Sequence, residues 1–378
     1  MEEIYLDNNA TTPVDQRVAE LVMHCFTEEY GNAGSRTHIW GANASKLVEK
    51  AREQLASPIN SSPEDVIFTS GATESNNIAI LGMAEAAIEA GKTHLITTST
   101  EHKAVLEPFK KLEHQGFSLS ILPVKESGYP DPEELSNALT PETFLVSTMH
   151  ANNETGVESP LNSYSEILND HDAWWHVDAA QTYGKANQPL ADKRIDMISI
   201  SGHKMFAPKG VGALVVRRRG YTKPPLAPLV LGGGQERGIR PGTLPVPLIA
   251  GLGLAAELSS VENTERKKSC LSFREVLLEA FEPLNPTYNG DVEKMLPHVV
   301  NLSLPGINAE AALVALKGLI GVSNGSACTS ASYESSHVLL SMGLSNERIA
   351  GALRISWNHL TPLPDWNEIT KKLSIFRK

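Results

Sequence analysis

The sequence is poor in cysteine, and its three cysteines, Cys25, Cys270 and Cys328, are widely spaced along 378 residues. An odd number of distant cysteines does not make a disulfide framework, and no Cys-x-x-Cys pair suggests a zinc or redox site. We therefore expect no metal site and a reducing, cytoplasmic environment in which Cys328 remains a free thiol. Cys25 and Cys270 are interpreted as structural.

The chain also lacks a long apolar segment and an excess of positive charge. Its longest charge-free apolar stretch, residues 244–256, is too short to cross a bilayer and contains two prolines. The N-terminal residues MEEIYLDNNATT lack the basic and apolar regions of a signal peptide. A net charge of −11 argues against a dominant nucleic-acid surface. We expect no membrane and no direct nucleic-acid binding, and we interpret the Arg217–Arg219 run as the solvated end of a strand.

Short apolar runs alternate with helical segments between about residues 60 and 216. The runs predict seven strands, within residues 65–70, 93–99, 118–124, 143–150, 174–180, 197–202 and 212–218. The segments between them predict helices, including one continuous helix over 72–91 and one capped by Asp131. This alternation indicates an α/β fold with a mainly parallel seven-stranded sheet, which would bind ligands at the carboxyl ends of its strands.

The composition changes after about residue 256. A segment rich in proline and glycine, 220–247, precedes a charged helical stretch over 257–284 and then shorter mixed elements. We expect a large domain over 14–256 and a smaller α+β domain made of 1–13 and 257–378, which would also carry Cys328.

Polar clusters directly follow several predicted strands. Residues 69–77, TSGATESNN, join a strand to a helix whose first-turn N–H groups and Thr73 hydroxyl suit a phosphate. The alternative is that Thr73 is an ordinary helix cap. His102 follows the next strand, where it is either catalytic or a histidine that only satisfies a backbone group.

Two further clusters end later strands. Asp178 and Gln181 close an apolar strand, where a buried carboxylate needs a protonated ring nitrogen or a structural arginine. Lys204, beside Ser201 and His203, is either an amine nucleophile or an ordinary surface lysine. Together, a phosphate anchor, a stacking imidazole, a carboxylate for a ring nitrogen and a Schiff-base lysine form the set that a pyridoxal phosphate site needs.

Longer motifs resemble the cysteine desulfurases of the first group, which are class V aminotransferase-type enzymes with the fold type I of pyridoxal phosphate enzymes. The motifs extend from end to end of the chain. They include YLDNNATTPV (5–14), FTSGATESNN (68–77), TEHKAV (100–105), NNETGV (152–157), HVDAAQ (176–181), SGHK (201–204), GGGQERGIRPGTLPV (232–246), GSACTSAS (325–332) and LRISW (353–357). The resemblance is most specific at SGHK and GSACTS.

The resemblance implies a role for each matching residue. Lys204 would bond the cofactor, Asp178 would pair with its ring nitrogen, His102 would stack on its ring and Cys328 would accept sulfur. The other implied cofactor-binding residues are Ala72, Thr73, Asn153, Gln181, Ser201, His203 and, toward the neighbouring subunit of a homodimer, Thr243. The implied substrate-binding residues are Asn32, Asn153 and Arg354.

The implied reaction takes sulfur from L-cysteine, leaves L-alanine and passes a Cys328 persulfide to an acceptor protein. His102 is the candidate for protonating the leaving thiolate or activating Cys328. The motif YGNAGSRTH (30–38) resembles desulfurases that serve DNA phosphorothioation; iron–sulfur cluster assembly and tRNA thiolation are the other destinations. Two alternatives are a pyridoxal phosphate aminotransferase of the same fold, in which Cys328 has no sulfur role, and a non-catalytic sulfur carrier.

Overall fold

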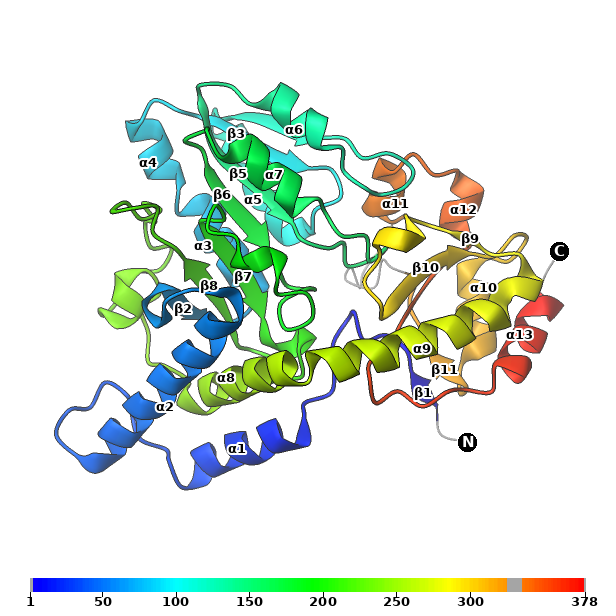
Figure 1. Ribbon diagram of the computed structural model, residues 1–378, viewed down its shortest axis with the longest axis horizontal. Coiled ribbons are helices and arrows are strands. Elements are labelled where there is room, and N and C mark those ends of the chain that lie inside the picture. The colour runs from blue at the N-terminus through cyan, green and yellow to red at the C-terminus, as the bar shows by residue number, and fades with distance from the viewer. Residues whose placement is uncertain (1–2, 325–334, 377–378) are drawn as a thin grey trace.

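A seven-stranded sheet lies at the centre of the structure (Figure 1), a computed structural model that describes residues 3–324 and 335–376. The strand order is β2-β8-β7-β6-β5-β3-β4. The strands are β2 Val66–Thr69, β3 His94–Thr98, β4 Ser118–Leu122, β5 Thr143–Met149, β6 Trp174–Asp178, β7 Met197–Ser201 and β8 Gly212–Val216. Each lies inside the range predicted for it.

The direction of the strands confirms a mainly parallel sheet. The four neighbouring pairs from β4 to β7 are parallel, whereas β8 runs antiparallel to both β7 and β2. All strands except the edge strand β4 are buried along almost their whole length, as expected where helices cover both faces. The carboxyl ends of the parallel strands therefore meet at one edge.

Helices cover the two faces of this sheet. They are α1 Gln16–Thr27, α2 Ile39–Ala56, α3 Ala72–Leu81, α4 Ala84–Glu89, α5 Lys103–His114, α6 Pro132–Ala138, α7 Leu161–Leu168 and α8 Val246–Val261. Successive strand residues point to opposite faces, so Ile67 packs with residues of α3, α4 and α5. Its neighbours Val66 and Phe68 pack with residues of α2, α7 and α8.

The continuous helix predicted over residues 72–91 is wrong, because the chain forms α3 and α4 with a break at Gly82 and Met83. The backbone N–H of Ala227 donates to the carbonyl oxygen of Gly82 over 2.8 Å. A Cβ atom at Gly82 would lie 2.8 Å from the carbonyl oxygen of Ala227, so this approach needs glycine. A contact with a segment about 145 residues away thus interrupts the helical pattern.

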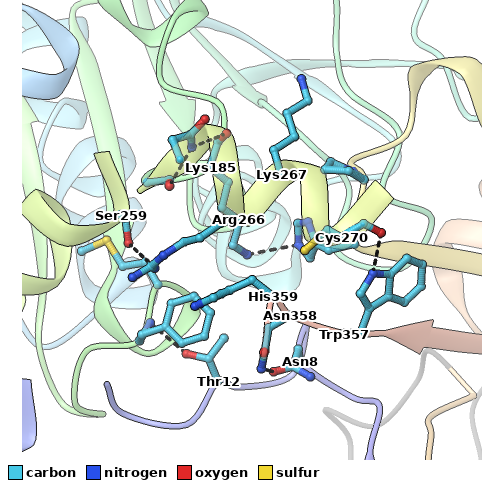
Figure 2. A pocket seen from close by; sticks show the side chains of 16 residues that line it. Asn8, Thr12, Lys185, Ser259, Arg266, Lys267, Cys270, Trp357, Asn358 and His359 are labelled. Atoms are coloured by element: carbon cyan, nitrogen blue, oxygen red, sulfur yellow. Dashed lines mark hydrogen bonds between the residues drawn. The ribbon is translucent and has the colours of Figure 1, made fainter. Parts of the chain in front are cut away.

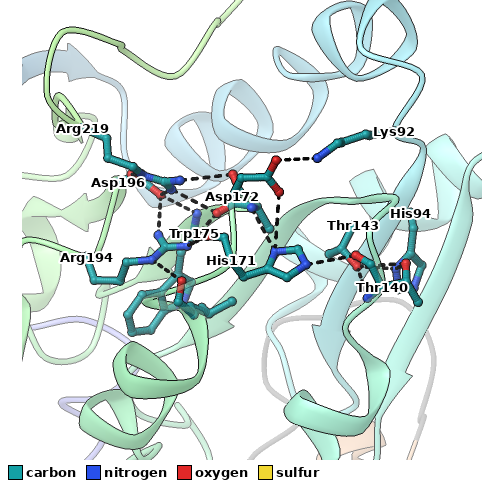
Figure 3. Close-up of polar contacts among 12 residues, drawn as sticks. Lys92, His94, Thr140, Thr143, His171, Asp172, Trp175, Arg194, Asp196 and Arg219 are labelled. Atoms are coloured by element: carbon teal, nitrogen blue, oxygen red, sulfur yellow. Dashed lines mark hydrogen bonds and ion pairs between the residues drawn. The ribbon is translucent and has the colours of Figure 1, made fainter.

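The interpretation of the arginine run as solvated is wrong for Arg217; Arg218 is exposed as expected, and Arg219 is partly exposed. Arg217 is 3% exposed and donates to four backbone carbonyl oxygens, including that of Ile59 at 2.7 Å. Arg219 binds Asp196, whose carboxylate also binds Arg194 and accepts the backbone N–H of Trp175 (Figure 3). Arg217 and Arg219 hold loops at the amino-terminal end of the sheet, and their acceptors come from segments far away in sequence.

The C-terminal part has its own sheets and core. An antiparallel sheet has the order β12-β10-β9, and β1 pairs with β11 in parallel. The elements are β1 Ile4–Tyr5, β9 Thr287–Tyr288, β10 Val299–Ser303, β11 Ile320–Gly321, β12 Ala352–Ser356, α9 Asn263–Phe281, α10 Ala309–Leu316, α11 His337–Ser341, α12 Asn346–Ala350 and α13 Trp366–Ile375. Phe273 stacks on Trp357 in the core of this part.

Short 3-10 helices complete the described elements. They span Ser57–Ile59, Pro63–Asp65, Pro189–Ala191, Gly202–Lys204, Gln235–Gly238, Glu282–Leu284 and Val292–Lys294. Within residues 3–324 and 335–376, none of the helices combines the length and the apolar character needed to span a bilayer.

Candidate active site

A cavity of about 410 Å³ lies where β5, β6 and β7 end. Most of the predicted site residues line it: Ala72, Thr73, His102, Asn153, Asp178, Gln181, Ser201, His203, Lys204 and Arg354. They lie at the ends of separate strands or in the segments that follow them, and on β12. Residues that are far apart in the sequence therefore line one cavity. Cys328 lies outside the described residues.

Asp178 is the last residue of β6 and is 6% exposed. Its Oδ2 accepts a hydrogen bond from Asn76 Nδ2 at 2.7 Å, and its Oδ1 accepts one from the backbone N–H of Ala180 at 2.9 Å. Hydrogen-bond donors thus reach both carboxylate oxygens. The carboxylate is therefore oriented and able to pair with a cation in the cavity.

Lys204 lies in the short helix that directly follows β7. Its Nζ donates to the backbone carbonyl oxygens of Asn9 and Ala10 at 2.5 and 2.7 Å. Strand β7 is buried throughout, which fixes the point at which the lysine leaves the sheet. The amine is thus directed at the N-terminal segment that forms one wall of the cavity.

His102 is the N-cap of α5, and its Nδ1 accepts the backbone N–H of Ala104 at 3.1 Å. An acceptor at Nδ1 leaves the proton of a neutral imidazole on Nε2. Burial is the main reason why the pKa of His102 is lowered, with Lys204 and His337 acting in the same direction and Asp178 opposing them. His102 is therefore a neutral ring that can donate from Nε2.

The start of α3 forms another part of the cavity wall. Gly71 is its N-cap, with φ of 150° in a region that favours glycine, and no side chain caps the helix. The alternative that Thr73 is the cap is therefore wrong. Ala72 and Thr73 occupy the first helical positions, where backbone N–H groups lack intrahelical acceptors. Ser201 and His203 line the same cavity, and burial and nearby lysines lower the pKa of His203 to about 4.

The opposite wall holds Arg354, on β12. Its side chain is 3% exposed; Nη2 binds Asp7 Oδ1 at 2.6 Å and Nη1 donates to the carbonyl oxygen of Asn153 at 3.1 Å. The same carbonyl oxygen accepts Nδ2 of Asn9 at 3.2 Å. Gln181 also reaches this segment, since its Nε2 donates to the carbonyl oxygen of Asn9 at 3.0 Å.

Two predicted residues do not line the cavity. Asn32 is exposed, and its Oδ1 accepts the backbone N–H of Gly34 at 2.8 Å. Thr243 is also exposed, three residues before α8. Neither lines the cavity within one chain, and both roles remain predictions, of which that of Thr243 involves a second subunit.

Sequence analysis missed three residues that shape the cavity. Asn76 orients Asp178, Asn9 accepts from Lys204 and Gln181, and Glu74 lines the cavity while it pairs with Arg240 at 2.9 Å. Asn76 and Asn9 lie in the motifs 68–77 and 5–14, each beside a second asparagine. The motifs therefore marked the segments, but only the structure distinguishes the asparagine that faces inward.

Comparison with known proteins identifies the family. The profile of the family described as Aminotransferase class-V matches residues 4–362. The chain belongs to this family. It is 44% identical over 359 residues to the cysteine desulfurase IscS of Neisseria gonorrhoeae, covering 95% of this chain and 88% of that protein.

Solved structures of similar proteins share the fold of this class V aminotransferase. DndA from Streptomyces lividans is 47% identical with a TM-score of 0.82, and the match covers 92% of this chain and 98% of that one. A NifS-like protein is 38% identical with a TM-score of 0.89, and the match covers 100% and 98% of the two chains. The similarity therefore extends through both the large sheet and the C-terminal part.

Class V aminotransferases use pyridoxal phosphate, and the cavity has polar atoms that fit it. Asn76 Oδ1, Gln181 Oε1 and Arg354 Nε are buried, and none has a hydrogen-bond partner among the described residues. Buried polar atoms normally have partners, so these atoms favour a polar ligand in the cavity. The N-terminus of α3 suits the phosphate and Asp178 suits a protonated ring nitrogen. The residues present therefore fit the cofactor of the family.

Proposed function

We propose that this member of the class V aminotransferase family is a pyridoxal phosphate-dependent cysteine desulfurase. It would convert L-cysteine to L-alanine and a persulfide on Cys328. The observation that carries the proposal is the convergence of Lys204, Asp178 and Arg354 on one cavity. This occurs in a chain that is 44% identical to a cysteine desulfurase over 95% of its length.

The residues that would hold the cofactor divide by chemistry. Ala72, Thr73, Ser201 and His203 would bind the phosphate, Asp178 would bind the ring nitrogen, and Asn153 and Gln181 would bind ring substituents. His102 would stack on the ring and Lys204 would bond the cofactor. When bound, pyridoxal phosphate supplies an electron sink for the charge left at the substrate α-carbon when its proton is removed.

The chain's own groups would then move the protons. Lys204 Nζ accepts the α-proton of L-cysteine, since its position after β7 directs it into the cavity. Arg354 and Asn32 bind the substrate carboxylate, for which the planar guanidinium offers two parallel donors. His102 would use the ring proton on Nε2 to protonate a leaving thiolate.

Cys328 would attack the substrate sulfur in its thiolate form. An ordinary cysteine has a pKa of about 8.5, so its thiol needs a nearby proton acceptor or positive charge for rapid attack at neutral pH. The Cys328 sulfur bonds to the substrate sulfur as the substrate C–S bond breaks. The electron pair of that bond stays with the substrate carbon, which a proton later neutralises to give L-alanine.

The working unit would be a homodimer in which Thr243 reaches the phosphate of the neighbouring subunit. The exposure of Thr243, which does not line the cavity of its own chain, supports this assignment. Each subunit would comprise a large domain over 14–256 and a small domain from 1–13 and 257–378. The pairing of β1 with β11 supports the inclusion of the N-terminal segment in the small domain.

The persulfide would pass to an acceptor protein in the cytoplasm. The motif over 30–38 supports DNA phosphorothioation as the destination, with iron–sulfur cluster assembly and tRNA thiolation as the alternatives. Reconstitution with purified acceptors from each pathway, and measurement of sulfur transferred from labelled cysteine, would choose among them.

The test of the reaction is the formation of L-alanine and sulfide from L-cysteine with a thiol reductant. We expect wild type to form both, Cys328→Ala to lose both, and Cys25→Ala, which removes a buried cysteine in α1, to behave as wild type. Lys204→Ala should lose the absorbance at about 400 nm that a lysine-bound cofactor gives. Alanine formation by Cys328→Ala at the wild-type rate would overturn the sulfur-transfer step, and amino transfer to a keto acid would favour the aminotransferase alternative.

A further inference from the structure

A second cavity, of about 50 Å³, lies beside the segment that carries Lys204 and shares no lining residue with the first cavity. Met205 and Phe206 form part of its wall, and α9 contributes Arg266 and Cys270 (Figure 2). Lys185, which follows β6 by seven residues, is also in the lining. The proposed reaction uses none of these side chains.

Lys185 has an uncommon environment for a lysine. Its Nζ lies 3.2 Å from His298 Nε2, and no carboxylate binds it among the described residues. Burial, together with the charge of Lys204, lowers the pKa of Lys185 to about 7, and burial also lowers the pKa of His298 well below its usual value. Near neutral pH, a large share of Lys185 is therefore an uncharged amine next to an uncharged imidazole.

The electrostatics of this cavity favour an anion. All of its lining residues are described, and none is Asp or Glu. Arg266 contributes a guanidinium that pairs outside the lining with Glu262 at 2.7 Å and donates to Ser259 Oγ at 3.2 Å. Burial raises the pKa of the Cys270 thiol to about 11, so this thiol provides no negative charge. A negatively charged group formed on Lys185 would therefore be attracted to the guanidinium of Arg266 in the same lining.

The size of the cavity limits the reagent. A cavity needs only about 10–15 Å³ to hold a water molecule, so about 50 Å³ admits a molecule of a few heavy atoms. A wider hollow of about 420 Å³ adjoins it, and Lys185, Asn263, Lys267 and Pro297 line both. Lys185 therefore lies between this cavity and a wider hollow.

We propose that Lys185 is a carbamylation site for carbon dioxide, with His298 as the group that positions the amine and takes its proton. The Lys185 Nζ lone pair bonds to the carbon of carbon dioxide, and one C=O electron pair moves onto oxygen. The proton leaves Nζ for His298 Nε2 and then for water. The product is a carbamate monoanion in a cavity whose lining has a cation and no carboxylate.

The direct test uses wild-type holoenzyme and needs no variant. The protein is incubated with bicarbonate, treated with triethyloxonium to convert carbamates into stable ethyl esters, and analysed by peptide mass spectrometry. Lys267 is the matched control, because it lies in the same lining but is exposed and points away from the cavity in Figure 2. We expect at least a roughly tenfold higher modified fraction at Lys185, because little of an ordinary lysine is uncharged at neutral pH.

A second measurement separates covalent from simple anion binding. With ¹³C-bicarbonate, wild type should give a carbamate ¹³C signal that Lys185→Gln lacks and Lys267→Gln keeps. Equal modification of Lys185 and Lys267, no ester at Lys185, or a signal from bound bicarbonate alone would each overturn the proposal. Should Lys185→Gln not fold, the wild-type peptide result still decides.

Discussion

Asn76 Nδ2 donates to Asp178 Oδ2 across 2.7 Å, and both residues are buried. Asn76 lies one turn into α3, the helix whose first residues would hold the cofactor phosphate. Asp178 ends β6 and would pair with the cofactor ring nitrogen. This single hydrogen bond therefore couples the two ends of the proposed cofactor site, and it is a feature that the motifs alone did not identify.

Asn76→Ala should reduce the rate of alanine formation about 10- to 100-fold, because a hydrogen bond to a charged group contributes about 1.5–3 kcal/mol. The cofactor should also dissociate faster, as measured by loss of its absorbance on dilution. Asn77→Ala is the matched control, since Asn77 Nδ2 donates only to the backbone of Thr73. Equal rates for Asn76→Ala and wild type would show that Ala180 alone orients Asp178.

Arg354→Lys should raise the KM for L-cysteine about 10- to 100-fold with a smaller change in kcat. An ammonium group lacks the planar fork that can bind both oxygens of a carboxylate. The control is Arg348→Lys, because Arg348 binds Asn289 at 3.0 Å outside the cavity. Steady-state kinetics on both variants check this prediction, and an unchanged KM in Arg354→Lys would remove Arg354 from substrate binding.

The sheet could be predicted because each strand is a short segment rich in apolar residues, as in Val66–Thr69. The antiparallel direction of β8 could not, because the apolar pattern of Gly212–Val216 does not distinguish it from the parallel strands of the sheet. The break at Gly82 was missed for a similar reason. It depends on Ala227, and local helical periodicity has no information about such a distant contact.

The residues of the candidate site could be predicted from the sequence, but the hydrogen bonds between them could not. Lys204 and Asp178 stand out because charged residues at the ends of apolar strands are unusual. Asn76 and Asn77 are indistinguishable in sequence, and only the rotation of α3 turns one of them toward Asp178. Thr243 could not be tested from one chain, because its predicted partner is a second copy.

Glu236→Ala should lower the free energy of unfolding by about 3–5 kcal/mol, because it removes the buried carboxylate that pairs with Arg52 and leaves the exposed Glu49 as the remaining carboxylate partner among the described residues. Glu236 Oε2 accepts from Arg52 Nη1 at 3.1 Å and from the backbone N–H of Phe68 at 2.7 Å. Chemical denaturation measures the change. Lys110→Ala is the control, since its exposed pair with Glu107 should contribute less than about 0.5 kcal/mol. Similar losses in both variants would contradict a special role for the buried pair.

Glu101→Gln should remove a pH dependence of stability that wild type has. Burial raises the pKa of Glu101 from 4.5 to about 8, against the hydrogen bonds from Thr98 and the backbone of Met149. Between these two pH values the folded state keeps a proton that the unfolded state has lost. This contribution to stability is therefore fully present below about pH 4.5 and is lost as the pH rises toward 8.

The expected difference between Glu101→Gln and wild type changes by on the order of 3–5 kcal/mol across that range, in favour of the variant at high pH. Denaturation curves at several pH values measure it, and the difference cancels the titration of buried histidines such as His176, which both proteins share. Gln retains the side-chain oxygen that accepts from Thr98 and Met149. Any remaining cost of the substitution in stability is the same at every pH, so it does not change the pH dependence of the difference. Glu107→Gln, at an exposed position of α5, serves as the control and should run parallel to wild type. A Glu101→Gln curve that also runs parallel to wild type would mean that Glu101 is ionised in the folded protein throughout this range.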